Sequence, residues 1–180
     1  MRHLSRFISL IGIVPNSTGH AEKFISAIGS LLGILAIITI TRYFVSSDGA
    51  ALLVASMGAS SVLLFIVPQS PFSQPWPLLA GHLVPAAIGV TCAILIWDLL
   101  IASAVTVSVT ILVMQYLRCT HPPGGATALT AVIGGSEIHN LGYQFLITPV
   151  AINVMVILAM AILVNYWFPW RRYPISLKQE

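Results

Sequence analysis

Charged side chains are scarce in this sequence. Its 180 residues include five acidic and eight basic side chains, so only 7% of the residues are charged, whereas soluble domains carry roughly 25%. This scarcity excludes an ordinary soluble domain. The net charge of +3 comes mainly from basic residues near the two ends and forms no patterned basic face, so we expect no nucleic-acid partner.

Cysteines and catalytic pairs are equally few. The two cysteines, Cys92 and Cys119, support neither a disulfide framework nor a metal site, and we expect both to be small buried thiols. No paired carboxylates lie inside the apolar runs, and no nucleophile stands out beside a base. His82 and His121 lack the spacing of metal ligands. We therefore expect no enzyme activity, no cofactor and no metal.

Long apolar runs are what the sequence does contain, and 57% of its residues are hydrophobic. Runs of close to 20 residues have the length of helices that cross a bilayer, and the alternation of a membrane barrel is missing. The sequence predicts an all-α, polytopic bundle of transmembrane helices. The runs are Phe24–Val45, Ala50–Val67, Leu78–Trp97, Leu99–Leu117 and Tyr143–Phe168, with a shorter one at Pro122–Ile133.

The chain divides into three parts. Residues 1–21 form an N-terminal interfacial segment, in which Phe7–Val14 resembles a signal sequence but has no convincing cleavage site. Residues 22–175 form a single transmembrane domain, and residues 176–180 a cytoplasmic tail. Inside the domain, four prolines in the ten residues Pro68–Pro77 predict a loop that cannot be helical.

The segment Cys119–Leu129 interrupts the apolar pattern with a histidine, two prolines and two glycines. Prolines are tolerated in the first turn of a helix, so the segment predicts a helix start with Thr120 or His121 at the cap. A helix that begins at membrane depth offers unpaired amides to an anion. The alternative is a plain turn at the membrane surface.

A weak internal repeat relates two small-residue segments. Gly58–Leu63 and Gly125–Leu129 share a pattern of glycine, alanine, a hydroxyl residue, and small or apolar residues. The alternative is that the compositional bias of membrane helices produces this likeness. The repeat divides the domain into units 22–97 and 98–170. Six segments, with short or broken helices at Ala50–Val67 and Pro122–Ile133, would make these units inverted repeats. If both short helices are re-entrant, four crossings remain.

Charge placement gives an orientation. Lys23 near the first run and Arg171 after the last one place both termini in the cytoplasm, because basic residues favour that side. With six crossings, Asp98 and Glu137 fall outside and Arg118 falls inside, as the rule prefers. Arg42 falls outside and counts against it.

The order of several motifs resembles a known family. His121-Pro122-Pro123 followed by Gly-Gly-Ala-Thr-Ala-Leu is similar to the signature of the HPP family of small integral membrane proteins. The segments Ala55–Ser60, Gln74-Pro75-Trp76, Gly81-His82 and Arg171–Pro174 resemble that family too. The likeness covers about residues 22–175.

Some members of that family are described as nitrite transporters. The resemblance therefore implies transport of a small inorganic anion, most of all nitrite, across the bacterial inner membrane. A passive anion channel and a membrane scaffold without transport activity are the alternatives. The expected partners are nitrite, the lipid bilayer and copies of the chain itself, in a number that no feature fixes.

The expected substrate pathway lies between the two short helices. Amides near Gly124 and Gly125 and hydroxyls of Ser60 and Thr127 would bind the anion, while His121 would donate or titrate. Each residue has a plainer role: His121 as a cap, His82 at the interface, Arg118 as a topology signal. The candidates are Ser56, Gly58, Ser60, His82, Arg118, His121, Pro122, Pro123, Gly124, Gly125 and Thr127.

Overall fold

The structure is a computed structural model that describes residues 10–12, 18–45 and 47–175. Most of the expected interfacial segment 1–21 and all of the tail 176–180 lie outside the described residues. The described residues form helices and connecting turns, and no strand occurs among them. The all-α prediction is confirmed.

Four of the described helices are long and apolar enough to cross a membrane. They cover most of the long runs seen in the sequence, which identifies a multi-pass membrane protein. These helices are α2 (His20–Thr41), α4 (Pro75–Leu95), α5 (Leu99–Tyr116) and the continuous stretch Leu146–Tyr166, in which a π-helical segment (Leu146–Ala151) leads into α8 (Ile152–Tyr166).

Two further helices have shorter apolar parts. Helix α3 spans Ser47–Ile66, with its apolar part at Ala50–Ile66, and α6 spans only Pro123–Ile133. A small helix, α7 (Gly135–Leu141), follows α6. Helices α3 and α6 lie where the sequence predicts short or broken helices. The crossing of the membrane by six segments stays a proposal.

Several predicted boundaries are wrong, and proline chemistry explains the largest error. Helix α4 begins at Pro75, inside the stretch predicted to be a loop, and a 3₁₀ turn occupies Pro71–Ser73. Pro75 and Pro77 lie in the first turn of α4, where their missing amide hydrogens would have no helical partner. By contrast, Asp98 caps α5 as its polar position suggests, because its carboxylate accepts from the Ile101 amide at 2.9 Å.

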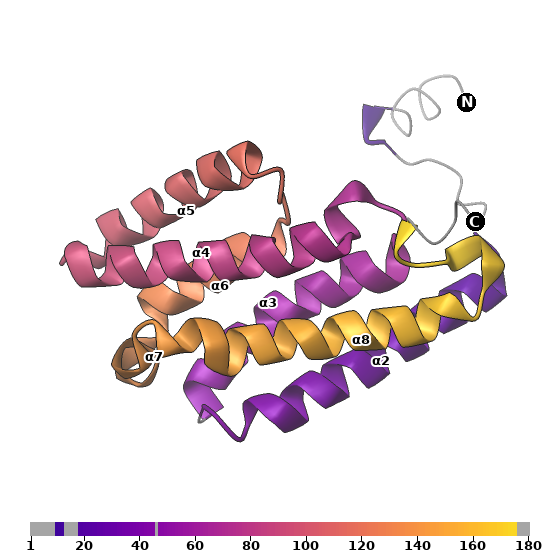
Figure 1. The fold of residues 1–180 in the computed structure, drawn as a ribbon, viewed down its shortest axis with the longest axis horizontal. Helices are drawn as coiled ribbons and strands as arrows, with labels where there is room; N and C mark the ends of the chain where they lie inside the picture. Colours follow the sequence, from indigo (N-terminus) through magenta and orange to yellow (C-terminus); the bar gives the residue numbers. More distant parts are fainter. Residues whose placement is uncertain (1–9, 13–17, 46, 176–180) are drawn as a thin grey trace.

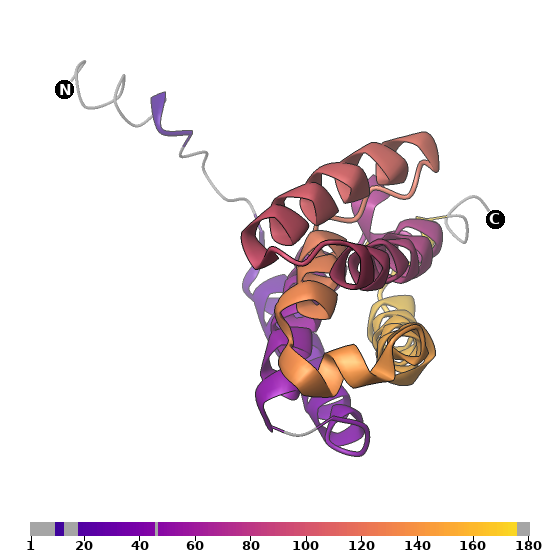
Figure 2. The same ribbon diagram turned by 90° about the vertical axis from the view of Figure 1, so that its left-hand side faces the viewer.

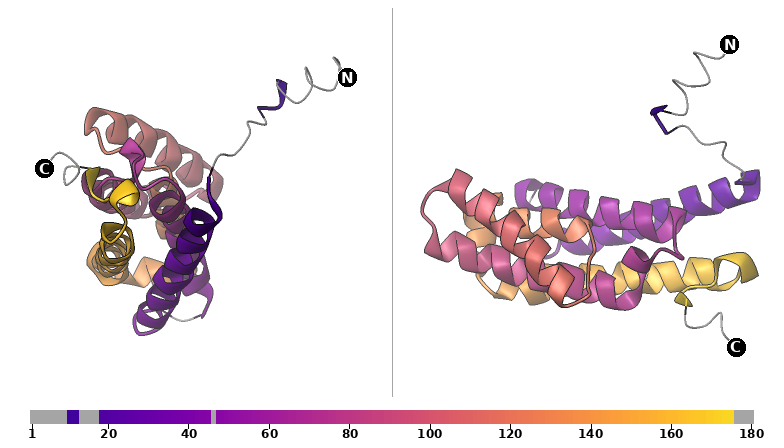
Figure 3. Two further views of the ribbon diagram at one scale, coloured as in Figure 1. Left: turned by 90° about the vertical axis from the view of Figure 1, so that its right-hand side faces the viewer. Right: turned by 90° about the horizontal axis from the view of Figure 1, so that it is seen from above.

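The helices lie side by side along one long axis and alternate in direction (Figure 1). Helices α2 and α8 extend toward one end of the molecule, and α4 and α5 toward the other (Figure 3). The end-on view shows α6 inside the bundle (Figure 2), where it contacts α3, α4 and α5. Among the site residues of α6, Pro123, Gly124 and Thr127 are buried and Gly125 is half-buried.

Helices α4 and α6 approach each other through glycines. An added side-chain carbon on Gly124 would lie 1.7 Å from the Gly81 carbonyl oxygen, and one on Gly89 would lie 2.3 Å from the Ala128 carbonyl oxygen. Pro85, four residues after Gly81 in α4, has no amide hydrogen to give that carbonyl. The Gly81 carbonyl, which has no helical donor, thus packs against Gly124, which has no side chain. The two backbones are in contact at this point.

Arg171 joins the segment after the last membrane helix to the start of α2. Its guanidinium is 1% exposed and forms an ion pair with Glu22 at the start of α2. It also donates to Asn165 Oδ1 at 2.9 Å and to the Phe65 carbonyl at 2.6 Å. Burial lowers the pKa of Arg171 and Glu22 opposes that change, so the guanidinium keeps its charge. The structure gives this residue a structural role.

We expect Gly124→Ala to destabilise the bundle, because the new methyl group would overlap the Gly81 carbonyl oxygen. Overpacking of this kind costs about 1–3 kcal/mol, which thermal unfolding in detergent would measure. Gly125→Ala is the matched control, since nothing lies within 4 Å of the added carbon. Equal losses in both variants would contradict the close packing of α4 and α6.

Arg171→Ala should destabilise the protein by about 3–5 kcal/mol, the usual cost of removing one partner of a buried ion pair. The change leaves Glu22 without its guanidinium and the Phe65 carbonyl without its donor. Arg172→Ala is the control, because Arg172 is exposed. Chemical or thermal unfolding of both variants gives the comparison, and similar stabilities would refute the role of Arg171.

Candidate functional site

Five polar side chains meet inside the bundle, and each is 0% exposed. Ser56 and Ser60 come from α3, His82 from α4 and Thr127 from α6, while His121 lies just before α6. We call these five residues the histidine cluster. All five are candidates from the sequence, and the structure brings them into one hydrogen-bonded group.

Ser60 lies between the two histidines. Its hydroxyl is 2.8 Å from His82 Nε2 and 3.0 Å from His121 Nε2. The imidazole rings meet edge to face, with centroids 4.8 Å apart and planes at 60°. One hydroxyl therefore links the same ring atom of both histidines.

The hydrogen bonds continue in both directions from this bridge. On one side, His82 Nδ1 is 2.6 Å from Thr127 Oγ1, which is 2.7 Å from Ser56 Oγ. Ser56 Oγ in turn lies 2.9 Å from the Pro123 carbonyl oxygen. On the other side, His121 Nδ1 is 2.8 Å from the Phe72 carbonyl oxygen. The short contacts form a single chain that ends at two backbone carbonyls, and Ser60 Oγ also lies 3.4 Å from the Ser56 carbonyl oxygen.

The start of α6 differs from its prediction. Pro122 occupies the N-cap position, α6 begins at Pro123, and no side chain caps it. The cap role predicted for Thr120 or His121 is therefore wrong, and His121 turns toward α3 and Phe72 instead. The amides of Gly124 and Gly125 already donate to the His121 and Pro122 carbonyls. Neither amide is free to bind an anion in this conformation.

The remaining candidates lie at different distances from the cluster. Gly124 is buried at the α4–α6 contact, whereas open space surrounds the position of a Cβ on Gly58 or Gly125. Arg118 is exposed and has a positive φ of 52°, so its side chain lies outside the cluster. His82 is fully buried, which makes its interfacial interpretation wrong. Cys92 and Cys119 are buried free thiols, as expected.

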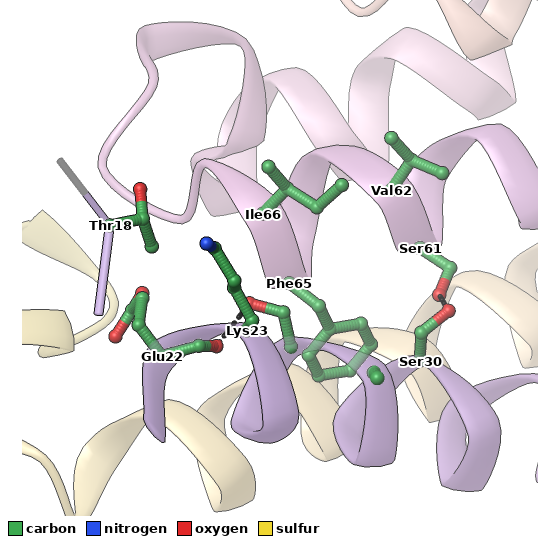
Figure 4. Close-up of a pocket in the computed structure, with 10 residues that line it drawn as sticks. Thr18, Glu22, Lys23, Ser30, Ser61, Val62, Phe65 and Ile66 are labelled. Carbon is green, nitrogen blue, oxygen red and sulfur yellow. Dashed lines mark hydrogen bonds between the residues drawn. The ribbon is translucent and has the colours of Figure 1, made fainter. Parts of the chain in front are cut away.

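A separate groove opens between α2 and α3, with a volume of about 480 Å³. Lys23 and Glu22 lie at one end of it, and the hydroxyls of Ser30 and Ser61 bond to each other at 2.8 Å further along (Figure 4). Ser61 follows Ser60 in α3, but the two side chains serve different surfaces: Ser61 lines the groove and Ser60 the cluster. Helix α3 separates the groove from the cluster.

Two contributors to the site are not among the candidates predicted from the sequence. The Phe72 carbonyl oxygen carries no signal in the sequence, because every residue has a carbonyl. Tyr173 belongs to a motif that the sequence did single out, and its hydroxyl donates at 2.6 Å to the carbonyl of Ser73, next to Phe72. The Arg171–Pro174 motif therefore holds the turn whose Phe72 carbonyl accepts the hydrogen bond from His121.

The chemistry available to the cluster is hydrogen bonding and proton exchange. Its members are hydroxyls and imidazoles, which both donate and accept. In the part of the chain that the structure describes, no group of three or more histidines, cysteines or carboxylates has the arrangement of a metal site. In this structure the cluster directs its hydrogen bonds to its own members and to backbone carbonyls.

Comparison with known proteins places this chain among membrane proteins. A family described as the HPP transmembrane region matches residues 15–174. A transmembrane protein of Dictyostelium discoideum is 34% identical over 153 residues, which cover 82% of this chain and 53% of that protein. A second transmembrane protein of the same organism is 34% identical over 155 residues, or 83% of this chain and 49% of its own length.

The chain spans about half the length of the curated relatives it matches. No solved structure matches it. The family match covers most of the chain, including the helices that build the histidine cluster. This protein belongs to the HPP family of transmembrane proteins.

Proposed function

We propose that this protein carries a small inorganic anion across its membrane, with nitrite as the first substrate to test. The observation that supports this proposal best is the histidine cluster, a continuous group of buried polar side chains between α3, α4 and α6. Ionisable residues inside a membrane are costly and usually mark a pathway or a relay. The choice of nitrite comes from the resemblance to nitrite-transporting members of the family.

The arrangement of the helices favours a transporter built from inverted repeats. Exchange of α2 with α5, α3 with α6, and α4 with α8 maps α2–α3 onto α5–α6 and α2–α8 onto α4–α5, which are contacts of similar extent. The most extensive contact, α4–α6, maps onto the smaller α3–α8 contact. The central contact of α3 with α6 maps onto itself. Transporters of this plan bind their substrate between the repeats, at short or broken helices. The histidine cluster lies at that contact.

Six crossings also suit the ends of the bundle. The start of α2 and the segment after α8 lie together, since Glu22 pairs with Arg171, and an even number of crossings returns the chain to its first side. Basic residues at both ends favour the cytoplasmic side. We therefore place both termini in the cytoplasm and, for a bacterial protein, the bundle in the inner membrane.

The closed state of the cluster favours a carrier over a channel. Its five side chains are fully buried and bond to one another or to backbone carbonyls, whereas a conducting pore needs a continuous polar path. A carrier passes through states in which its site is closed to both sides. Separation of α3 from α6 would free the hydroxyls of Ser60 and Thr127 for the anion.

His121→Ala should lower nitrite uptake into proteoliposomes at least about tenfold, the change that corresponds to about 1.4 kcal/mol. The substitution removes a ring that contacts both Ser60 and the Phe72 carbonyl. His139→Ala is the matched control, because His139 is an exposed histidine in α7. Both variants should insert and elute in gel filtration like the wild type.

Other results would point to other functions. Uptake at the wild-type level in His121→Ala would remove the histidine from the pathway. Conductance in planar bilayers, without saturable uptake, would favour an anion channel. The absence of both signals in the wild-type protein would leave a membrane scaffold as the better description.

A further inference from the structure

The histidine cluster has more short contacts than hydrogens to fill them. Six contacts of 3.0 Å or less join its five side chains to one another and to the carbonyls of Phe72 and Pro123. With both imidazoles neutral, each ring supplies one hydrogen and each of the three hydroxyls supplies one. Five hydrogens therefore serve six contacts.

The neutral arrangement is fixed from one end. A carbonyl only accepts, so His121 Nδ1 carries the hydrogen that it donates to Phe72. Its Nε2 must then accept from Ser60, whose oxygen in turn accepts from His82 Nε2. His82 Nδ1 is left to accept from Thr127. The two histidines are opposite tautomers, and the single hydrogen of Ser56 is divided between Thr127 and the Pro123 carbonyl.

We propose that the histidine cluster is a binding site for one proton. An added proton on His121 Nε2 is donated to Ser60, whose own hydrogen then turns to His82 Nε2. His82 moves its hydrogen to Nδ1 and donates to Thr127, Thr127 donates to Ser56, and Ser56 donates to the Pro123 carbonyl alone. All six contacts then hold one hydrogen each, and the positive charge resides on His121.

No charged side chain contacts either imidazole ring in the described part of the chain, so the cluster residues alone bind the proton. In the described part of the chain, the contacts of the two rings are with the hydroxyls of Ser60 and Thr127, with the Phe72 carbonyl and with each other, and none of these carries a formal charge. Two further titratable groups belong to the neighbouring segments: the buried thiol of Cys119, two residues before His121, and Tyr173, which donates to the turn beside Phe72. Arg118 is exposed.

A bound proton gives the cluster a role in the proposed transport, because it neutralises the charge of the anion. This step rests on the proposed function. An anion held among neutral side chains at membrane depth is strongly disfavoured. One proton on the cluster neutralises one nitrite, so the pair can cross together without moving net charge. Uptake should then follow an inward proton gradient and be insensitive to the membrane potential.

Nitrogen-15 NMR of the full chain in lipid bilayers tests proton binding without any transport. The variant His3→Gln/His20→Gln/His139→Gln leaves only the two cluster histidines to be labelled. At alkaline pH we expect one ring protonated at Nδ1 and the other at Nε2. On acidification the signals of both rings should change together: His121 becomes an imidazolium and His82 changes tautomer.

Ser60 provides the matched pair of variants. Ser60→Ala removes the bridge, so His82 should keep one tautomer while His121 titrates. Ser60→Thr keeps a hydroxyl and should keep the joint change. Independent titration of the two rings in the wild type, or a His82 that is protonated at Nδ1 throughout, would overturn the proposal even if Ser60→Ala does not fold.

The two proposals fail separately. A joint change of the two rings in a protein that takes up no nitrite would support the proton site and remove the proposed substrate. Nitrite uptake by a protein whose rings titrate independently would keep the transporter and overturn the shared proton.

Discussion

The lipid tails of a bilayer offer no hydrogen bonds, so the polar side chains of the histidine cluster depend on other parts of the protein for their partners. The contact between α4 and α6 meets that constraint. Gly124 packs on the Gly81 carbonyl, and this approach brings His82 within reach of Thr127. The other ring nitrogen of His82 contacts Ser60 on α3. A larger residue at either glycine would separate the groups that satisfy one another. Close backbone packing and the buried polar site are therefore one property of the fold.

The fold class and most helices follow from the sequence because a membrane span needs length and apolarity. Both properties can be read directly from the apolar runs of the sequence. The helix ends were harder. Pro75 and Pro77 indicated a loop, yet both lie in the first turn of α4, where proline is as well suited as it is in a turn. Composition does not separate these two uses of proline. The start of α6 raised the same difficulty, and its cap proved to be Pro122.

The members of the candidate site were predicted better than their contacts. Ser56, Ser60, His82, His121 and Thr127 stood out as polar residues in apolar surroundings, and the structure joins all five. Their pairing depends on residues far apart in the chain, such as Ser60 and His121, 61 positions apart, and a single sequence does not show how helices pack. For the same reason the sequence indicated only a basic segment at Arg171, after the last apolar run. In the structure Arg171 is buried against Glu22, 149 positions away.

That ion pair has a mechanical consequence. Because Arg171 holds the start of α2, the end of α3 and the end of α8 in one buried group, these three helix ends cannot separate without exposing unpaired charge. An opening of the bundle that keeps this group intact would therefore leave these three helix ends together. Its displacements would lie elsewhere, for example at the opposite end of the long axis, where α7 follows α6 and precedes the last membrane helix (Figure 1). Arg171 thus makes one end of the bundle the part that is hardest to separate.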